Sequence, residues 1–457
     1  MRICVIGAGY VGLTTAVSFA LRGHSLILVD VVKPKVEMIN DAISPIYEDG
    51  LSEALMKVRA QESLVATSNH AEAVISSEVV FLCVDTPTNG NGESNLDSLN
   101  KAVRQVAENL AAEGRYRVVA VKSTVPPTTT EGVVYPVLRE MVRGDFGLCA
   151  NPEFLREGVA LRDALNPDRI VIGAIDQRSG DKMEELYSGF GVPIIRTTPA
   201  TAEMIKYASN CLLATEISFS NEIANICELT PGVDVARVMD ALHLDSRLSP
   251  MVNGERMQPG ILAYLRAGCG YGGSCLPKDV RALITYAQGH GYQAPLLEAV
   301  QAVNQNRPLR LINILREEVG DLSGRTVAVL GLAFKPDTDD MRASPAIGVV
   351  EGLLREGAVV QAYDPKATDN AKRLWADLPS IRFAASMDEA LQGADAAILV
   401  TAWSEFSRLS PEKMKRLMKK PFLVDGRRVI DAESLGPDVI YRGIGLGGRA
   451  KARARKD

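Results

Sequence analysis

The chain has 457 residues, a length that suggests two or three domains. Its 46% hydrophobic and 23% charged residues are ordinary for a globular protein, and a net charge of −5 offers no broad basic surface for nucleic acid. Seven scattered cysteines argue against a disulfide framework and predict a reducing, cytoplasmic location. We find no signal peptide, no apolar run long enough to span a membrane, and no metal-binding pattern of cysteine and histidine.

The N-terminal stretch has the pattern of a dinucleotide site. Residues 2–6 are an apolar run typical of a buried strand, the sequence GAGYVG follows at 7–12, and apolar residues then recur at helical spacing. A second apolar run, 25–29, ends in Asp30. The complete pattern predicts nucleotide binding far better than the glycines alone, because it combines a strand, a glycine turn, a helix and a second strand with an acidic end.

Each part of this pattern has a physical function. Gly7 makes the turn, Gly9 lets the backbone approach the pyrophosphate, and Gly12 lets the helix pack against the strand. The start of the helix presents amide groups to phosphate. Asp30 can accept hydrogen bonds from ribose hydroxyls, which favours NAD over NADP. Lys35 could reach the adenosine end of the cofactor, although a solvated helix charge is the alternative.

Strands and helices then alternate. We predict strands at 79–84, 117–122 and 148–150, and a helix at 97–112, which indicates a parallel sheet with helices on both faces. Ligands of such sheets bind outside the carboxyl ends of the strands. Polar residues that follow the three strands should therefore surround one site: Thr86, Thr124, Glu153 and Glu157.

Residues 200–229 contain no proline or glycine and predict a thirty-residue helix. A helix of that length could bridge two domains and offer a dimer face. Lys206 and Asn210 lie four residues apart and therefore share one side of it. We interpret them as groups that face the site of the first domain, and an exposed polar face is the alternative.

The sequence GYGGSCLPKD at 270–279 combines glycines with a thiol and two charges. The glycines allow a tight turn close to a ligand, and Cys275 would be nucleophilic as a thiolate. The stretch is either a site of covalent chemistry or a turn with a small buried thiol. Shorter helices are predicted at 234–244 and at 283–304, the latter interrupted around 289–291.

A second α/β unit follows residue 324. Strands are predicted at 326–330, 359–363, 396–400 and 422–424, and a helix at 346–356. Because the unit lacks a full GxGxxG, it suggests a nucleotide or nucleotide-sugar domain and not a second dinucleotide site. Cations at its strand ends suit phosphate: Lys335, Arg427 and Arg428.

Taken together, these motifs resemble those of the UDP-glucose/GDP-mannose dehydrogenase family. The matching sequences are GAGYVG at 7–12, DTPT at 85–88, KSTVPP at 122–127, NPEFLREG at 151–158, EMIKYASN at 203–210, GYGGSCLPKD at 270–279, GLAFKPDTDDMRASP at 331–345 and DGRR at 425–428. The resemblance implies an α/β fold with two Rossmann-like, doubly wound parallel-sheet domains joined by a long central helix. The implied segments are 1–198 for NAD binding, 199–310 for a helical dimerisation domain, 320–445 for the nucleotide sugar and 446–457 as a disordered basic tail.

The resemblance also implies a reaction. The C6 hydroxyl of a hexose is oxidised to a carboxylate in two NAD-linked steps, with Cys275 holding the aldehyde as a thiohemiacetal and then a thioester. Lys206 and Asn210 match groups that stabilise the reacting oxygen, and Asp279 matches an aspartate that positions the lysine or a water. Glu153 matches a base or water-positioning carboxylate, and Thr124 a hydroxyl that orders the water network.

By the same resemblance, further residues contact the two ligands. The residues placed at the cofactor are Gly7, Gly9, Tyr10, Val11, Gly12, Asp30, Lys35, Thr86, Thr124, Glu157 and Arg342. Those placed at the substrate are Glu153, Phe154, Leu155, Lys206, Asn210, Tyr264, Leu265, Gly272, Phe334, Lys335 and Arg427. No metal is implied.

Several alternatives stay open. The CLPKD ending favours glucose or mannose over N-acetylhexosamines, and we prefer UDP-glucose, giving UDP-glucuronate, with GDP-mannose as the alternative. The segment 246–268 is longer and more polar than is usual for the family, and a partner subunit could supply Arg247 or Arg256 from it. A homodimer or higher oligomer is expected, without nucleic-acid or membrane partners. A single-oxidation hydroxyacid dehydrogenase and a catalytically silent NAD-binding protein are weaker alternatives.

Overall fold

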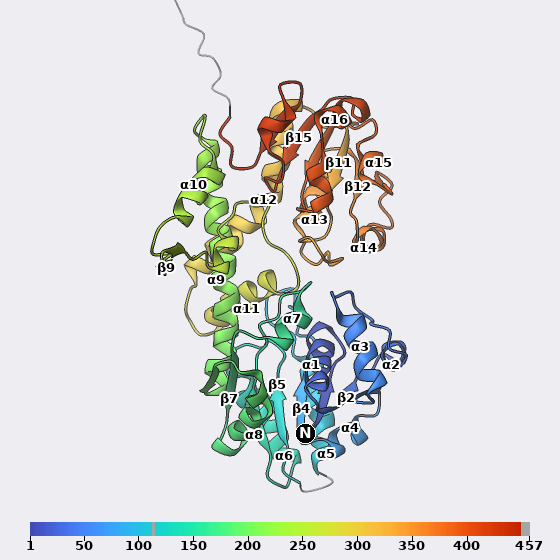
Figure 1. Ribbon diagram of the computed structural model, residues 1–457, viewed down its shortest axis with the longest axis vertical. Coiled ribbons are helices and arrows are strands. Elements are labelled where there is room, and N and C mark those ends of the chain that lie inside the picture. The colour runs from blue at the N-terminus through green and yellow to red at the C-terminus, as the bar shows by residue number, and fades with distance from the viewer. Residues whose placement is uncertain (112–114, 449–457) are drawn as a thin grey trace, which may run out of the picture. The chain divides into compact units, whose positions relative to one another are not determined.

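The computed structural model describes residues 1–111 and 115–448, and the chain forms two compact units (Figure 1). Unit 1 comprises residues 1–209 and 285–290, and unit 2 comprises 210–284 and the residues from 291 onward. The basic run of the predicted tail, 449–457, lies outside the described residues. The finer division at 198, 310 and 320 stays a prediction.

Unit 1 is built on an eight-stranded sheet in the order β3-β2-β1-β4-β5-β6-β7-β8. Its strands are β1 (Arg2–Ile6), β2 (Ser25–Val29), β3 (Leu64–Thr67), β4 (Val79–Leu82), β5 (Val118–Val121), β6 (Gly147–Ala150), β7 (Ile170–Ala174) and β8 (Ile194–Thr197). The α/β class is confirmed, but the sheet is not parallel throughout, because β7 runs antiparallel to β6. After β6 the chain makes only the short helix α7 and then returns along the same strand, so no crossover restores the direction.

Helices cover both faces of this sheet. Alternate residues of β1 point to opposite sides, so Ile3 and Val5 join one apolar cluster with α1, while Cys4 and Ile6 join another with α4 and α5. The helices are α1 (Tyr10–Leu21), α2 (Lys33–Asn40), α3 (Leu51–Ala60), α4 (His70–Ser76), α5 (Asp97–Ala111), α6 (Tyr135–Met141), α7 (Ala160–Leu165) and α8 (Gln177–Tyr187), with a π-turn at Thr130–Val134 and a 3₁₀ turn at Ser188–Phe190.

The predicted long helix is α9 (Pro199–Glu228), which begins in unit 1 and continues into unit 2. It is followed by α10 (Val235–His243), the hairpin strands β9 (Met251–Val252) and β10 (Glu255–Arg256), a 3₁₀ turn (Gly260–Tyr264), α11 (Leu276–Gly289) and α12 (Pro295–Val319). The hairpin lies in the long segment 246–268. Its turn is Asn253–Gly254, and both residues have positive φ, as such two-residue turns require.

The predicted helix at 283–304 is wrong in its outer bounds, but its predicted interruption around 289–291 is confirmed. Two helices occupy this region, because Gly291 has φ +79 and Pro295 begins α12. The first helix already starts at Leu276, one residue after Cys275, and the second extends to Val319.

The rest of unit 2 is a six-stranded sheet, parallel throughout, in the order β13-β12-β11-β14-β15-β16. Its strands are β11 (Thr326–Leu330), β12 (Val359–Tyr363), β13 (Ile381–Phe383), β14 (Ala396–Leu399), β15 (Phe422–Asp425) and β16 (Ile440–Gly443). Its helices are α13 (Pro345–Arg355), α14 (Thr368–Leu374), α15 (Met387–Leu391) and α16 (Pro411–Leu417), with 3₁₀ turns at Ser404–Arg408 and Ala432–Leu435. No helix in the described ranges is long and apolar enough to cross a membrane.

Candidate active site

The glycine turn after β1 has the geometry that a dinucleotide requires. Gly7 has φ +104, and a Cβ there would lie 2.5 Å from the carbonyl oxygen of Cys83. A Cβ on Gly12 would lie 1.7 Å from the carbonyl oxygen of Gly7, so only glycine lets α1 start this close to β1. A Cβ on Gly9, by contrast, would meet nothing within 4 Å. The space beside Gly9 and the uncapped start of α1 fit a pyrophosphate group.

Asp30 ends β2 beside this turn. Its Oδ2 accepts a hydrogen bond of 2.8 Å from the amide of Ala8, and its Oδ1 accepts one of 2.9 Å from the amide of Val32. A carboxylate has about four acceptor positions, so two remain for ribose hydroxyls. Tyr10 and Val11 form the first turn of α1, and Lys35 lies half-buried in α2.

Three predicted site residues follow adjacent parallel strands. Because β4, β5 and β6 are neighbours, Thr86, Thr124 and Glu153 lie at the same edge of the sheet. The Thr86 hydroxyl donates a hydrogen bond of 2.7 Å to the carbonyl oxygen of Thr124, which joins two of the strand ends directly. Glu157 lies half-buried further along the segment that follows β6.

Glu153 and Lys206 form a buried ion pair. The Lys206 Nζ lies 2.8 Å from Glu153 Oε1, and the two side chains are 4% and 6% exposed. Oε2 of Glu153 accepts a hydrogen bond of 2.5 Å from the amide of Leu155. Burial opposes ionisation of Glu153, but the charge and hydrogen bond of Lys206, the amide of Leu155 and the charge of Lys122 together outweigh it and hold the pKa of the carboxyl below its ordinary value. The Lys206 ammonium also lies 5.6 Å from the ring centre of Phe154.

A second buried cation, Lys122, lies near this pair. Its Nζ donates a hydrogen bond of 3.2 Å to Asn151 Oδ1, and Lys122, Asn151 and Glu153 line one pocket of unit 1. Burial lowers the pKa of Lys122, while the charge of Glu153 works in the opposite direction. One signal of this residue is visible in the sequence, namely a lysine at the end of an apolar strand.

In unit 2, Cys275 stands directly before α11 and its carbonyl oxygen accepts the first hydrogen bond of that helix, from the amide of Asp279. None of the seven cysteines forms a disulfide bond, and Cys275 alone is exposed. The position at the helix start favours a negative charge, because the helix dipole is positive at this end. The alternative of a small buried thiol at this position is therefore wrong.

Asp279 is the centre of a buried polar cluster. It is 1% exposed, its Oδ2 accepts a hydrogen bond of 2.6 Å from Asn210, and its Oδ1 lies 2.6 Å from the Nζ of Lys278. These contacts place Asn210 of α9 against the helix that follows the thiol. They also show that Asp279 is the ion-pair partner of Lys278, a residue for which the sequence offered no interpretation.

The thiol loop, residues 268–275, packs against the segment that follows β11. The amide of Gly273 donates a hydrogen bond of 2.8 Å to the carbonyl oxygen of Arg342. A Cβ on Gly272 would lie 2.4 Å from the carbonyl oxygen of Ala343, and one on Gly273 would lie 2.8 Å from the ring of Phe334. The glycines thus allow close contact between the thiol loop and a predicted substrate residue.

The turn after β11 resembles the turn after β1 but differs in its acid. Asp364, which ends β12, accepts hydrogen bonds from five donors: the amides of Leu332, Ala333, Lys366 and Ala367 and the indole nitrogen of Trp403. Its acceptor positions are therefore filled, unlike those of Asp30. In addition, the start of α13 is capped: the Ser344 hydroxyl accepts a hydrogen bond from the amide of Ala346 and donates one of 2.7 Å to the carbonyl oxygen of Leu332 in this turn, whereas the start of α1 has no side-chain cap. Both observations favour a role other than dinucleotide binding.

Comparison with known proteins identifies the family. Three family profiles match in order: the NAD binding domain of the UDP-glucose/GDP-mannose dehydrogenase family over residues 1–191, its central domain over 200–306 and its UDP binding domain over 328–432. The chain belongs to the UDP-glucose/GDP-mannose dehydrogenase family. The sequence-based prediction of this family, and of an NAD-dependent oxidoreductase acting on a nucleotide sugar, is confirmed.

Relatives match over nearly their whole length. UDP-glucose 6-dehydrogenase from Rhizobium meliloti is 41% identical over 94% of this chain and 95% of its own. UDP-glucose 6-dehydrogenase AglM from Haloferax volcanii is 40% identical over 94% and 97%. The solved structure of a UDP-glucose dehydrogenase from Pyrobaculum islandicum has a TM-score of 0.88 at 37% identity and covers 98% of both chains.

The remaining residues predicted to contact the ligands have fewer contacts with other predicted site residues. Tyr264 and Leu265 are half-buried at the end of a 3₁₀ turn. Arg342 pairs with Asp340, its Nη2 lying 2.7 Å from Oδ2. Lys335 is half-buried beside Phe334, with its Nζ 5.7 Å from the ring centre.

Of the three cations suggested for phosphate, Arg428 is already bound. Its guanidinium donates hydrogen bonds of 2.7 and 2.8 Å to the two carboxylate oxygens of Asp234. Arg427 donates through Nε to the carbonyl oxygen of Val400 at 2.7 Å.

The arginines of the 246–268 segment also have local partners. Arg247 pairs with Asp245, and Arg256 donates to the carbonyl oxygens of Leu244 and Ser249. Within residues 1–111 and 115–448, no group of His, Cys, Asp and Glu has an arrangement suited to a metal ion.

Proposed function

We propose that this chain oxidises the C6 hydroxyl of UDP-glucose to the carboxylate of UDP-glucuronate, with two molecules of NAD reduced per sugar. The first step removes a hydride and a proton from the alcohol and leaves an aldehyde. The Cys275 thiolate then adds to the aldehyde, and the thiohemiacetal loses a second hydride to become a thioester. Water hydrolyses the thioester, which releases the acid and restores the thiol.

The observation that carries this proposal is the placement of Cys275. It is the one exposed thiol among the seven cysteines, it precedes α11, and it lies next in sequence to the buried cluster around Asp279. An aldehyde cannot give up a hydride readily until a nucleophile makes its carbon tetrahedral, and a thiolate does this well.

We assign roles to the residues around each step. Lys206 stabilises the oxygen that becomes an alkoxide and then an oxyanion, since a buried ammonium acts strongly on charge that develops nearby. Asn210 and Asp279 form the polar support beside the thiol. Glu153, held ionised by Lys206, positions or deprotonates the hydrolytic water, and Thr124 orders the water network.

The glycine turn of unit 1 would hold NAD, which supplies the hydride acceptor when bound. By the family resemblance we assign these residues to the nucleotide sugar: Phe154, Leu155, Tyr264, Leu265, Gly272, Phe334, Lys335 and Arg427. The relatives named UDP-glucose 6-dehydrogenase support UDP-glucose as the sugar nucleotide. The absence of disulfide bonds among the seven cysteines supports a cytoplasmic location.

We also propose that the chain forms a homodimer through α9. Leu212, Phe219 and Ile226 are 52%, 48% and 54% exposed and recur every seven residues, so they form one apolar stripe along the helix. A second copy of the chain would cover this stripe. Phe219→Glu should yield monomers in sedimentation velocity, and an unchanged dimer in that variant would contradict the assignment of this surface.

The reaction is tested by its stoichiometry. Purified protein is given limiting UDP-glucose, GDP-mannose, UDP-galactose or a UDP-N-acetylhexosamine, and NADH and product mass are measured. We expect two NADH and one acid per UDP-glucose. Cys275→Ser should stop after one NADH, whereas the control Cys211→Ala, a buried thiol of α9, should keep two. Two NADH from Cys275→Ser, or turnover of GDP-mannose alone, would refute the proposal.

A further inference from the structure

The main chain of the thiol loop is held by side chains from two helices. At Gly268, the amide donates a hydrogen bond of 2.8 Å to Asn221 Oδ1 on α9, and the carbonyl oxygen accepts one of 3.0 Å from Arg307 Nε on α12. At Tyr271, the amide donates to Asn304 Oδ1 at 2.8 Å, and the carbonyl oxygen accepts from Asn304 Nδ2 at 3.0 Å. Three side chains thus bind four main-chain groups just before Cys275.

This contact is close and permits little movement. Gly270, which lies between the two bound residues, has φ +104, and a Cβ there would lie 2.7 Å from Asn304 Oδ1. Asn221 is 0% exposed and Arg307 is 1% exposed. Because the loop is rich in glycine, it has few side chains that could anchor it, and the main-chain groups are the available points of attachment.

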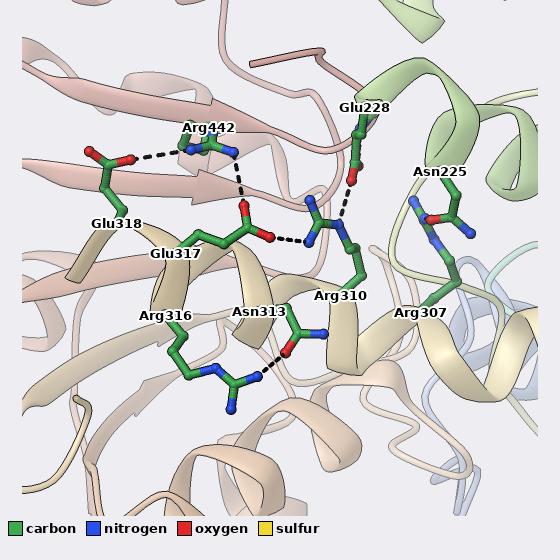
Figure 2. A network of polar contacts seen from close by, with 10 residues as sticks. Asn225, Glu228, Arg307, Arg310, Asn313, Arg316, Glu317, Glu318 and Arg442 are labelled. Carbon is green, nitrogen blue, oxygen red and sulfur yellow. Dashed lines mark hydrogen bonds and ion pairs between the residues drawn. The ribbon is translucent and has the colours of Figure 1, made fainter. Parts of the chain in front are cut away.

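The two helices are in turn joined to each other. Arg307 Nη1 donates to Asn225 on α9, and the next residue on the same side of α12, Arg310, pairs with Glu228 on α9. Figure 2 shows Arg310 between Glu228 and Glu317, with Arg442 of β16 continuing the network. The side chains that bind the loop therefore come from a cross-linked pair of helices.

The burial of Arg307 is not explained by stability alone. Burial lowers the pKa of its guanidinium to about 10, and its Nη2 has no hydrogen-bond partner among the described residues. An apolar residue of similar volume would fill this position without the cost of removing a charge from water. The buried guanidinium instead supplies a directional donor to the Gly268 carbonyl group.

We propose that Asn221, Asn304 and Arg307 are positioning residues that fix the place of the Cys275 thiol through the main chain of Gly268 and Tyr271. This inference rests on the proposed role of Cys275. Removal of a hydride from the alcohol does not use the thiol, whereas capture of the aldehyde requires it at bonding distance. Loosening the loop should therefore slow the second oxidation selectively and let aldehyde escape.

Asn304→Leu is the most direct test, because it keeps a similar volume and removes both hydrogen bonds to Tyr271. We expect the first oxidation to change less than about three-fold and the second to slow at least about ten-fold, since small misplacements of a reacting group have effects of this size. Released aldehyde, trapped with a hydrazine, should appear, and alkylation of Cys275 by iodoacetamide should change in rate. Asn306→Leu is the control, because Asn306 is exposed and its amide bonds only Ala302 of its own helix.

A second variant guards against loss of folding. Asn304→Asp keeps the acceptor for the Tyr271 amide and removes the donor to its carbonyl oxygen, and we expect the same selective defect to a smaller degree. Two NADH per acid at unchanged rates and no aldehyde from a folded Asn304 variant would overturn the positioning role. If Cys275→Ser also gave two NADH, the proposed function itself would fail, so the two failures are distinguishable.

Discussion

Removing the charge of Glu153 should destabilise unit 1 strongly. The Glu153 and Lys206 charges lie 2.8 Å apart and almost out of contact with water. At an effective dielectric constant of about 20, such a pair attracts by about 6 kcal/mol. Part of this energy offsets the desolvation of both ions, and breaking a buried pair by removing one partner typically costs about 3–5 kcal/mol. We therefore expect Glu153→Gln to lose about 3 kcal/mol or more, because Lys206 would keep an uncompensated charge.

The assay must report on unit 1. Both tryptophans, Trp375 and Trp403, lie beyond residue 320, so tryptophan fluorescence is unsuitable. Hydrogen exchange of the β5 and β6 amides, followed by mass spectrometry, measures local opening instead. A loss of 3 kcal/mol corresponds to a decrease in protection of about a hundred-fold. Lys206→Met should have a similar effect, and the double variant should lose much less than the sum of the two single losses.

A matched control separates this effect from ordinary charge removal. Glu78 and Lys182 also lie 2.8 Å apart, but their side chains are 47% and 24% exposed. Glu78→Gln should cost below about 1 kcal/mol. Because the pKa of Glu153 is depressed in the folded chain, its contribution is present above the unfolded value of 4.5 and is lost as pH falls through the lower folded value. Additive single losses, or less than about three-fold change in Glu153→Gln, would refute the reasoning.

Three further predictions concern the two turns and α9. Gly9→Ala should weaken NAD binding in calorimetry with little loss of stability, whereas Gly12→Ala should also lower the melting temperature because its Cβ overlaps backbone; equal effects would contradict the geometry. Burial raises the pKa of Glu203 to about 7, so its ionisation reduces stability as pH rises from about 4.5 to 7, and Glu203→Gln should remove that loss in melts across pH. Asp364→Ala would leave five buried donors without their acceptor, and the fluorescence of Trp403 should report earlier unfolding in urea; an unchanged midpoint would be inconsistent with the hydrogen bonds described.

The parts of the fold that sequence predicts well are those governed by local rules. The glycine turn at 7–12 and the acid at Asp30 follow from adjacent residues, and the turn geometry bears out the glycine requirement at Gly7 and Gly12. The common position of Thr86, Thr124 and Glu153 follows from the rule that parallel strands end at one edge. The roles of these residues in catalysis stay proposals.

The parts that sequence does not predict depend on distant contacts. The direction of β7 is not encoded in hydrophobic periodicity, which is the same for parallel and antiparallel strands when both faces are buried. Asn304 binds Tyr271 across 33 residues, and nothing in its local sequence marks it. In the sequence, Lys122 is only the polar residue at the end of a strand. Its proximity to Glu153 follows from the pairing of β5 with β6, which the sequence does not show.

The contrast between Asp30 and Asp364 bears on the order of events in catalysis. Of these two turns, the one beside Asp30 keeps acceptor positions and an uncapped helix start for a dinucleotide, so we expect one subunit to hold one NAD at a time. Two hydrides must leave each sugar in the proposed reaction. The first NADH must therefore depart and a fresh NAD must enter while the half-oxidised sugar is still bound. The fraction of sugar that is oxidised to the acid then depends on whether the aldehyde stays bound during that exchange. The rates of the two hydride transfers matter less.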